Sequence, residues 1–366
     1  MFLTEAEILD TPLSLNYTCQ YFEKNKKNLE QFFQENQQKK FTILGCGSSY
    51  MLAKSTASLF ASLPGTSANA IAAGDYIVDP LFWYETVKGS IVLLLSRSGK
   101  TSEMVWALKH IKEAHGCPAV SITTEDGNDL MPLCDLNLTL NWCHDDSVCQ
   151  TRTVTNLYAS TLLLAAEYAR DDRLRESVLA AMRESTSFQL KYRPVLAEIA
   201  NLDWDNVVVL ADGPICGIAE EGALAFTEIS MLTGRYFHLL DYRHGPIVVS
   251  GKRTLTLALL RPGEEKLQSA MMKDVIQRGG PVVTISHCTE NRYDAAAHIQ
   301  IPEVGEFAAW GILFIYVAQM TALLKAIARD EAKRKADQAQ QPLPASVAAG
   351  LACEKQLFTK AGMRFS

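Results

Sequence analysis

The sequence predicts an α/β fold built of two tandem units, each with a parallel β-sheet between layers of helices. Continuous apolar runs alternate with stretches of helical periodicity, which is typical of parallel strands covered by helices on both faces. The same order of runs then repeats about halfway along the chain. The length of the chain agrees with two units, because 366 residues at ~100–200 residues per domain correspond to two domains or one large duplicated one.

The predicted strands end at glycines, and their spacing nearly matches in the two halves. The strands are expected at 39–47, 89–99, 118–124 and 136–140 in the first unit, and at 206–213, 254–263 and 281–287 in the second. From Gly47 to Gly99 is 52 positions, and from Gly213 to Gly263 is 50. The next strand follows at 21 and 20 positions in the two halves. Three matched strand ends in register indicate an internal duplication.

Helical periodicity occupies much of the remaining sequence. It predicts helices at 48–63, 101–114 and 153–182, and one that opens the segment 220–246 before running through Gly234 into an irregular stretch. The expected organisation is an N-terminal helical segment at 1–38, a first unit at 39–182, a linker helix at 183–203, a second unit at 204–330 and a tail at 331–366. Phe307–Ala328 is interpreted as a buried or interface helix, because its uninterrupted apolar run is shorter than the ~20 residues that span a bilayer.

Composition narrows the class of protein. The net charge is −6 and the pI is near 5.7, which argues against a nucleic-acid partner. Nine cysteines without a CxxC pair indicate a reduced, cytoplasmic protein, and the start MFLTEAEILD is acidic where a signal peptide is positive. No membrane partner is expected. Metal-ligand spacings such as HExxH are missing, as are the Walker and GxGxxG loops, so we expect no metal or nucleotide cofactor.

Two strand ends in the first unit combine glycine with hydroxyl side chains, at 45–49 (GCGSS) and 96–102 (SRSGKTS). Glycine lets a backbone approach a ligand closely, and the amides and dipole of a helix N-terminus favour an anion. A phosphate is the natural occupant, although the serines could instead only cap helices. In the second unit the matching turn carries Glu264 and Glu265, which would repel phosphate. The sequence therefore predicts one phosphate site, in the first unit.

A carboxylate and an imidazole near the centre of the second unit suggest acid–base chemistry. Glu228 is expected on a helix and His244 on the loop that ends it, and both groups can exchange protons near neutral pH. The alternative is that Glu228 faces solvent and His244 caps a turn. The polar segment 145–155 could reach the sugar or phosphate end of a ligand. Within it Arg152 is a phosphate clamp or, as we favour, a surface residue.

Several other residues are interpreted as structural. The three histidines at 238, 287 and 298 and the thiol of Cys46, which lies in the first phosphate turn, fall into this class.

The motifs GCGSS, SRSGKTSE, SVCQTRTVT, EEGALAFTEIS and YRHGP resemble those of the sugar isomerase (SIS) domain family over residues 40–330. The likeness is to proteins with two tandem SIS domains, such as the isomerase half of glucosamine-6-phosphate synthase, AgaS-type enzymes and fructosamine-phosphate deglycases. The resemblance implies flavodoxin-like three-layer units. It also implies a homodimer in which the histidine of the HGP segment reaches the active site of the neighbouring subunit.

The resemblance also assigns roles to residues. Glu228 would move a proton between C1 and C2, and His244 would help to open the sugar ring. The expected phosphate-binding residues are Gly47, Ser48, Ser49, Ser96, Arg97, Ser98, Gly99 and Thr101, and the possible substrate contacts are Lys100, Gln150 and Thr151.

The sequence departs from the synthases at several positions. Arg97 and Lys100 stand where synthases have Gln and Glu, and Gln150 stands where they have Ser. The synthase tail with its ring-opening lysine is not visible, and Lys360 is not expected to be catalytic. No glutaminase domain precedes residue 40, so glutaminase activity is not expected.

The function expected from these residues is an aldose/ketose isomerase acting on a 6-phosphosugar or an amino-sugar phosphate, through an enediol or enolamine. Two alternatives remain open. One is an amine-releasing deglycase or amino-sugar-phosphate deaminase. The other is a non-catalytic phosphosugar sensor, although residues 1–38 are too short and acidic for a basic DNA-binding domain.

Overall fold

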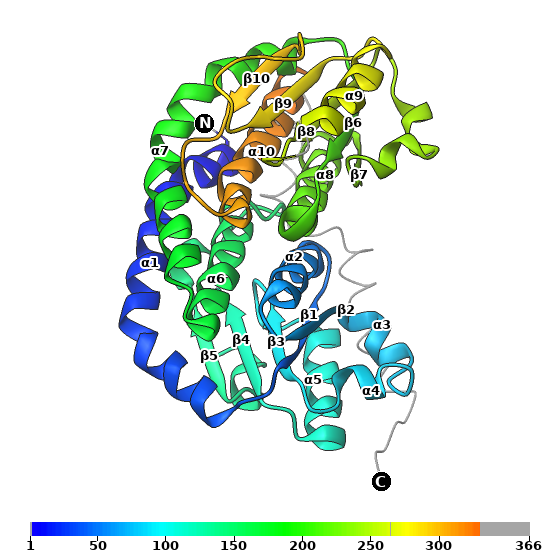
Figure 1. Ribbon diagram of the computed structural model, residues 1–366. Helices are drawn as coiled ribbons and strands as arrows, with labels where there is room; N and C mark the ends of the chain where they lie inside the picture. The colour runs from blue at the N-terminus through cyan, green and yellow to red at the C-terminus, as the bar shows by residue number, and fades with distance from the viewer. Residues whose placement is uncertain (1, 264, 330–366) are drawn as a thin grey trace, which may run out of the picture.

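The computed structural model describes residues 2–263 and 265–329, and it contains two five-stranded parallel sheets (Figure 1). The strands of the first are β1 Lys40–Gly45, β2 Ser67–Ala72, β3 Ile91–Leu95, β4 Ala119–Thr123 and β5 Leu136–Thr139; those of the second are β6 Asn206–Leu210, β7 Thr233–Phe237, β8 Thr254–Leu259, β9 Val282–Ser286 and β10 Ala297–Gln300. Their orders are β2-β1-β3-β4-β5 and β7-β6-β8-β9-β10. Both follow the 2-1-3-4-5 order of flavodoxin-like folds, so the predicted duplication is confirmed.

Three strands were not predicted from the sequence. β2, β7 and β10 lie at sheet edges and have exposed or half-buried positions instead of a continuous apolar run. The prediction that the chain is irregular after Gly234 is therefore wrong, since β7 pairs in parallel with β6 along its whole length.

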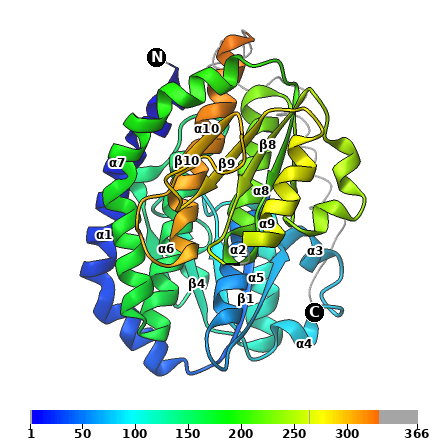
Figure 2. The same cartoon turned by 45° about the horizontal axis from the view of Figure 1, so that its top comes forward.

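A set of helices joins the two sheets through one shared core, with α1 Leu3–Glu35 and α7 Asp172–Asn201 along its edge (Figure 2). The set consists of α1, α7, α2 Ser48–Ser62, α6 Arg152–Ala169, α8 Cys216–Ser230 and α10 Trp310–Ala328, whose apolar side chains join one core. The outer face of the first sheet packs against α3 Ala73–Val78, α4 Tyr84–Val87 and α5 Ser102–His115, and that of the second against α9 Glu265–Ile276. Short 3₁₀ turns are η1 Met131–Leu133, η2 Asn141–Cys143, η3 Gly213–Ile215, η4 Asp241–Arg243, η5 Pro246–Val249 and η6 Phe307–Ala309.

The long helices α1 and α7 lie side by side along one edge of the molecule and reach both units (Figure 1). α1 confirms the predicted N-terminal helical segment. The single helix predicted at 153–182 is wrong, because Arg170 is left-handed (φ 52°) and Asp171 caps α7 by accepting a hydrogen bond from the amide of Leu174 at 3.0 Å. The predicted boundary at residue 183 thus falls inside α7.

The apolar segment Phe307–Ala328 is long and apolar enough to cross a membrane, but 94% of its most apolar window is buried inside the protein. α10 packs against α7 and α8, where the hydroxyl of Tyr316 donates to the carbonyl of Gln189 at 3.1 Å. The predicted buried helix is confirmed. The predicted tail, including Lys360, lies outside the described residues.

Candidate active site

The first candidate phosphate turn follows β1 and opens α2. Gly47 is left-handed (φ 53°), and Ser48 and Ser49 are buried in the first turn of the helix. Gly45 is required here, because a Cβ at this position would lie 2.4 Å from the backbone of Ser49. The tight turn therefore brings two hydroxyls to the N-terminus of a fifteen-residue helix, where an anion is stabilised.

The second turn follows β3 and opens α5. The hydroxyl oxygen of Ser96 accepts from the amide of Gly99 at 3.0 Å, and that of Ser98 accepts from the amide of Lys100 at 3.1 Å. Each hydroxyl keeps its own O–H to donate to a ligand. Gly99 is left-handed (φ 64°), and a Cβ there would overlap the side chain of Asn128 at 2.3 Å. Thr101 precedes the first residue of α5.

The two turns lie at the same edge of the sheet, because β1 and β3 are parallel neighbours. The chain passes from β1 to β2 on one side and then crosses to β3 on the other side of β1, so these turns flank the topological switch point. Ligands of open α/β sheets bind in the crevice at that point. The structure thus brings the predicted phosphate residues together.

The two cationic side chains of the second turn are engaged within the protein. Lys100 forms an ion pair with Glu125, and the Glu125 carboxylate raises the pKa of Lys100. Arg97 donates through Nη1 to the carbonyl of Ser147 at 3.0 Å and more weakly to that of Asp145 at 3.4 Å. Their ligand-binding roles remain predictions.

Helix α8 crosses α2 and carries carboxylates toward the first turn. Gly217 permits the crossing, since a Cβ there would lie 1.9 Å from the carbonyl oxygen of Met51. The amide of Ile218 donates to the hydroxyl of Ser55 at 2.9 Å, and Lys54 pairs with Glu220 at 2.8 Å.

Glu221 was not predicted as a site residue. Its side chain is 1% exposed and lies near Ser48, and its Oε2 is buried without a hydrogen-bond partner. Burial, followed by the charge of Glu228, raises the pKa of Glu221 well above its usual value. The seven-residue spacing from Glu228, which puts both on one helical face, was the available signal.

Glu228 lies two helical turns beyond Glu221, or roughly 10 Å along α8 at 1.5 Å per residue. Along α8, Ile218 contacts Ser55 in the middle of α2. Glu221 lies near Ser48, the first residue of α2. The part of α8 that follows, with Glu228, therefore extends past the N-terminus of α2. Glu228 is half-buried. The direction of α8 thus takes the Glu228 carboxylate beyond the first candidate phosphate turn.

His244 lies on a different element and is exposed. It follows η4, where its amide donates to the carbonyl of Asp241 at 2.9 Å. Arg243 ties this segment to α9 by an ion pair with Asp274 at 2.7 Å. The segment projects from the second unit beside β7 (Figure 1). Within one chain, His244 thus presents its imidazole to the outside of the unit.

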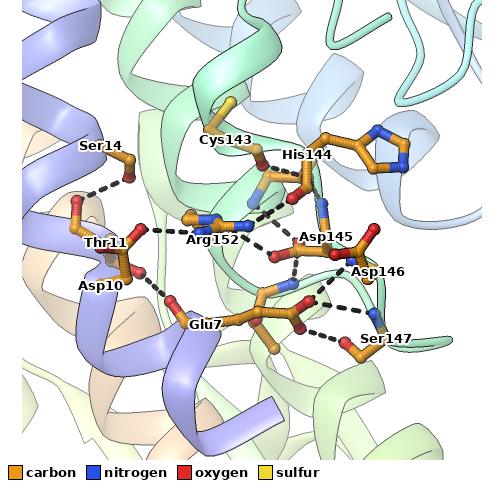
Figure 3. Close-up of polar contacts among 12 residues, drawn as sticks. Glu7, Asp10, Thr11, Ser14, Cys143, His144, Asp145, Asp146, Ser147 and Arg152 are labelled. Carbon is orange, nitrogen blue, oxygen red and sulfur yellow. Dashed lines mark hydrogen bonds and ion pairs between the residues drawn. The ribbon is translucent and has the colours of Figure 1, made fainter. Parts of the chain in front are cut away.

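The polar loop at 144–153 runs back to the start of α6. Arg152 is not a surface residue as we favoured: its side chain is 17% exposed, pairs with Asp10 at 2.7 Å and donates to the carbonyl of His144 (Figure 3). Thr151 is fully buried and its hydroxyl oxygen has no hydrogen-bond partner; the same holds for Oε1 of the half-buried Gln150.

One of the histidines interpreted as structural, His298, has a clear role in the fold. His298 bridges Thr284 and the carbonyl of Cys288 at 2.9 and 2.8 Å, which fits its predicted structural role. Over residues 2–263 and 265–329, no group of three or more His, Cys, Asp or Glu side chains is close enough to hold a metal ion.

Sequence comparison identifies one domain family in both units. The SIS domain sequence model matches residues 36–167 and 202–329. Among curated proteins, the chain is similar to the glutamine–fructose-6-phosphate aminotransferases (isomerizing) of Shewanella oneidensis, at 26% identity over 75% of this chain and 47% of that protein, and of Buchnera aphidicola, at 23% over 78% and 48%. The chain thus spans about half the length of these relatives.

Solved structures share the fold. The chain superposes with a TM-score of 0.80 on tagatose-6-phosphate ketose/aldose isomerase from Escherichia coli, at 20% identity over 89% of this chain and 93% of that one. With glucosamine-6-phosphate deaminase from Thermotoga maritima the TM-score is 0.73, at 24% identity over 89% and 95%. The likeness extends over both units and the helices between them.

Proposed function

The chain belongs to the SIS domain family, and we propose that it is an aldose/ketose isomerase that acts on a 6-phosphosugar or an amino-sugar phosphate. The names of its relatives and structural neighbours support a phosphorylated sugar as the substrate class. The observation that carries the proposal is the crossing of α2 and α8, which sets Glu228 beyond an anion-binding turn at the switch point of the first sheet.

In the proposed mechanism the phosphate binds at the two turns of the first unit. The hydroxyls of Ser48, Ser49, Ser96, Ser98 and Thr101 and the backbone near Gly47 and Gly99 hold it there. The sugar then extends toward α8. Glu228 removes the proton from the carbon beside the carbonyl while the carbonyl oxygen gains one, which gives the enediol or enolamine. The protonated Glu228, which can exchange with solvent, then delivers a proton to the neighbouring carbon while the second heteroatom loses its own, so the proton count is unchanged.

His244 is proposed to open the sugar ring in the active site of a second copy of the chain. Its exposed position on the projecting segment supports this arrangement. The proposed assembly is therefore a homodimer with the active site near the subunit interface. A cytoplasmic location rests on the unpatterned cysteines of the sequence.

Deuterium exchange tests the proposal. The protein is incubated in heavy water with the 6-phosphates of fructose, tagatose, glucosamine, galactosamine and fructose-amine, while NMR follows C1 and C2 and released amine is assayed. Deuterium at C1 or C2 without amine release is expected and identifies the sugar. Exchange with amine release would establish a deaminase or deglycase instead. Binding without exchange would exclude Glu228 as a base and establish a sensor.

A further inference from the structure

The N-terminal part of α1 contacts the loop at 144–151, although some 140 positions separate them in the sequence. Glu7 is 3% exposed, and its Oε1 accepts from the amides of Asp146 and Ser147 at 2.7 and 3.0 Å. Its Oε2 accepts from the hydroxyl of Ser147 (Figure 3). Hydrogen bonds to a charged acceptor are roughly twice as strong as neutral ones. One buried carboxylate therefore fixes this turn of the loop.

The same turn holds the second candidate phosphate loop. The carbonyl of Ser147 accepts from Nη1 of Arg97 at 3.0 Å, so Ser147 is bonded to α1 on one side and to Arg97 on the other. The carbonyl of Arg97 in turn accepts from the amide and hydroxyl of Thr124, both at 2.9 Å. A continuous series of hydrogen bonds thus joins Glu7 to the 96–101 turn.

Asp145 fixes the other end of the loop. Its Oδ2 accepts from the amides of Thr151 and Thr153 at 2.7 and 2.9 Å. The carbonyl of Thr151 accepts from Gln319 of α10 at 3.2 Å. The Thr151 backbone is therefore held on both sides while its buried hydroxyl oxygen has no partner.

An unpartnered buried polar group destabilises a fold, and a bound ligand is one way to satisfy it. In this segment Oε1 of Gln150 and Oγ1 of Thr151 have no hydrogen-bond partner, and neither do Nε of Arg152 and Oδ1 of Asp145, which lie 3.7 Å from each other. Gln150 and Thr151 belong to the segment whose ends are fixed by Glu7 and Asp145. The position of Gln150 and Thr151 in this segment relates the contact between Glu7 and the loop to ligand binding as well as to folding.

From these contacts we infer that Glu7 is a positioning residue for the phosphosugar site: through Ser147 it holds Arg97 of one ligand loop and sets the path of the loop that carries Gln150 and Thr151. The inference rests on the proposed function, since it takes the 96–101 turn as the phosphate site. It makes α1, which lies outside the repeated sheet units, a component of substrate binding.

Glu7→Gln is the test, with Glu5→Gln as its matched control. Glutamine keeps one acceptor for the two amides but removes the negative charge that strengthens the three hydrogen bonds, and its Nε2 can only donate to the Ser147 hydroxyl, which then donates to the carbonyl of Cys149 at 2.8 Å. Glu5 lies on the same turn of α1 but pairs with Arg193 of α7 at 2.6 Å and does not contact the loop. Ser147→Ala, which removes one of the three hydrogen bonds, replaces Glu7→Gln if that variant does not fold.

Two measurements are made on each full-length variant: amide hydrogen exchange of residues 144–151, and affinity for inorganic phosphate and fructose 6-phosphate. Glu7→Gln should raise the rate of amide exchange in the loop and lower the affinity for both ligands by about tenfold. Glu5→Gln should change neither the exchange rate nor the affinity. Where turnover is found, KM should rise more than kcat falls.

The outcomes separate the two claims. Unchanged loop exchange would refute the anchoring role of Glu7, and faster exchange with wild-type affinity would refute its role in ligand binding. If the unmutated protein bound neither ligand while Glu7→Gln still loosened the loop, the proposed function would fail, and with it the link to substrate.

Discussion

The two units share a sheet topology but differ at the turns that follow their first strands, β1 and β6. Gly47 and Gly213 are both left-handed and lie 166 positions apart. After Gly47 the chain enters α2 directly with two serines, whereas after Gly213 it passes through η3 with Pro214 before α8 begins. Only the first unit presents hydroxyls at the start of its helix.

The difference indicates a division of labour within a duplicated fold. Lys54 and Glu220 are also 166 positions apart, so the helices α2 and α8 meet through equivalent residues. In the proposed site α2 directs its N-terminus at the ligand, while α8 carries the carboxylates Glu221 and Glu228. The duplicated units thus contain two equivalent helices, α2 and α8, but α2 carries hydroxyl groups at its start and α8 carries carboxylates.

The largest effect should come from the carboxylate of the second unit. Glu228→Gln keeps the size of the side chain but cannot accept a proton, so turnover should fall by about 10²–10⁴-fold, the range for loss of a general base. Affinity for the phosphosugar should remain within a few-fold, because the phosphate is held by the first unit. Steady-state kinetics and calorimetry measure the two quantities.

Glu220→Gln is the control on the same helix, and its turnover should stay near wild type. Equal losses of affinity and turnover in Glu228→Gln would mean that the two units do not divide binding from chemistry.

The next largest effect should come from exchanging residues at the equivalent strand ends. Gly45 and Ala211 are 166 positions apart; Gly45 is the last residue of β1, and Ala211 directly follows the last residue of β6. Gly45→Ala would place a Cβ 2.4 Å from the backbone of Ser49, so α2 must shift; the expected cost is about 1–3 kcal/mol of unfolding free energy with loss of phosphate binding.

The reverse exchange, Ala211→Gly, should cost only about 1 kcal/mol and leave phosphate binding intact, because η3 separates this position from α8. Urea denaturation and phosphate titration of both variants compare the two units directly. Comparable losses of binding would show that the second turn also serves the ligand.

Glu221 and Ser55 occupy equivalent positions on α8 and α2, and only the former titrates. Because the pKa of Glu221 is raised above its usual value of 4.5, its protonated form favours the folded state at low pH. That contribution is lost as the pH rises through the raised pKa. Stability of the wild type relative to Glu221→Gln should therefore decrease above pH 4.5, by about 1.4 kcal/mol per pH unit until the raised pKa is reached.

Urea denaturation from pH 4 to 9 measures this effect. Ser55→Ala provides the comparison, since its cost relative to wild type should be the same at every pH. A pH-independent difference between wild type and Glu221→Gln would show that Glu221 is ionised in the folded protein.

The fold could be predicted where a local pattern decides the structure. Buried central strands such as β3 are continuous apolar runs that end at glycine, and two of them in parallel bring their turns together. Edge strands such as β7 have no such run, because one side of each is not packed against another strand. The break between α6 and α7 depends on a single left-handed residue, Arg170, which no periodicity marks.

The site was predictable only in part for a related reason. Ser48 and Glu228 belong to motifs with a recognisable chemical composition. The roles of Glu7 and Glu221 depend on burial against segments far away in the chain, which a single sequence does not reveal. Arg152 was misjudged as a surface residue because its partner, Asp10, lies 142 positions away.

The smallest effect should come from the ion pair where the two helices meet. Lys54 and Glu220 have side chains 34% and 27% exposed, so the pair should contribute at most about 1 kcal/mol. The charge swap Lys54→Glu with Glu220→Lys should restore most of what either single reversal loses, because the positions are equivalent. Chemical denaturation of the four proteins gives the coupling energy.

The swap should nevertheless remain slightly less stable than the wild type. Lys54 also lies 4.8 Å from the ring centroid of Tyr50, and the position equivalent to Tyr50 in the second unit is Cys216. A lysine at 220 would lose that cation–π contact, which is worth about 0.5–1 kcal/mol. With Tyr50→Leu already present, the swap should become neutral. A remaining deficit in that background would mean that α2 and α8 differ in more than the residues they exchanged.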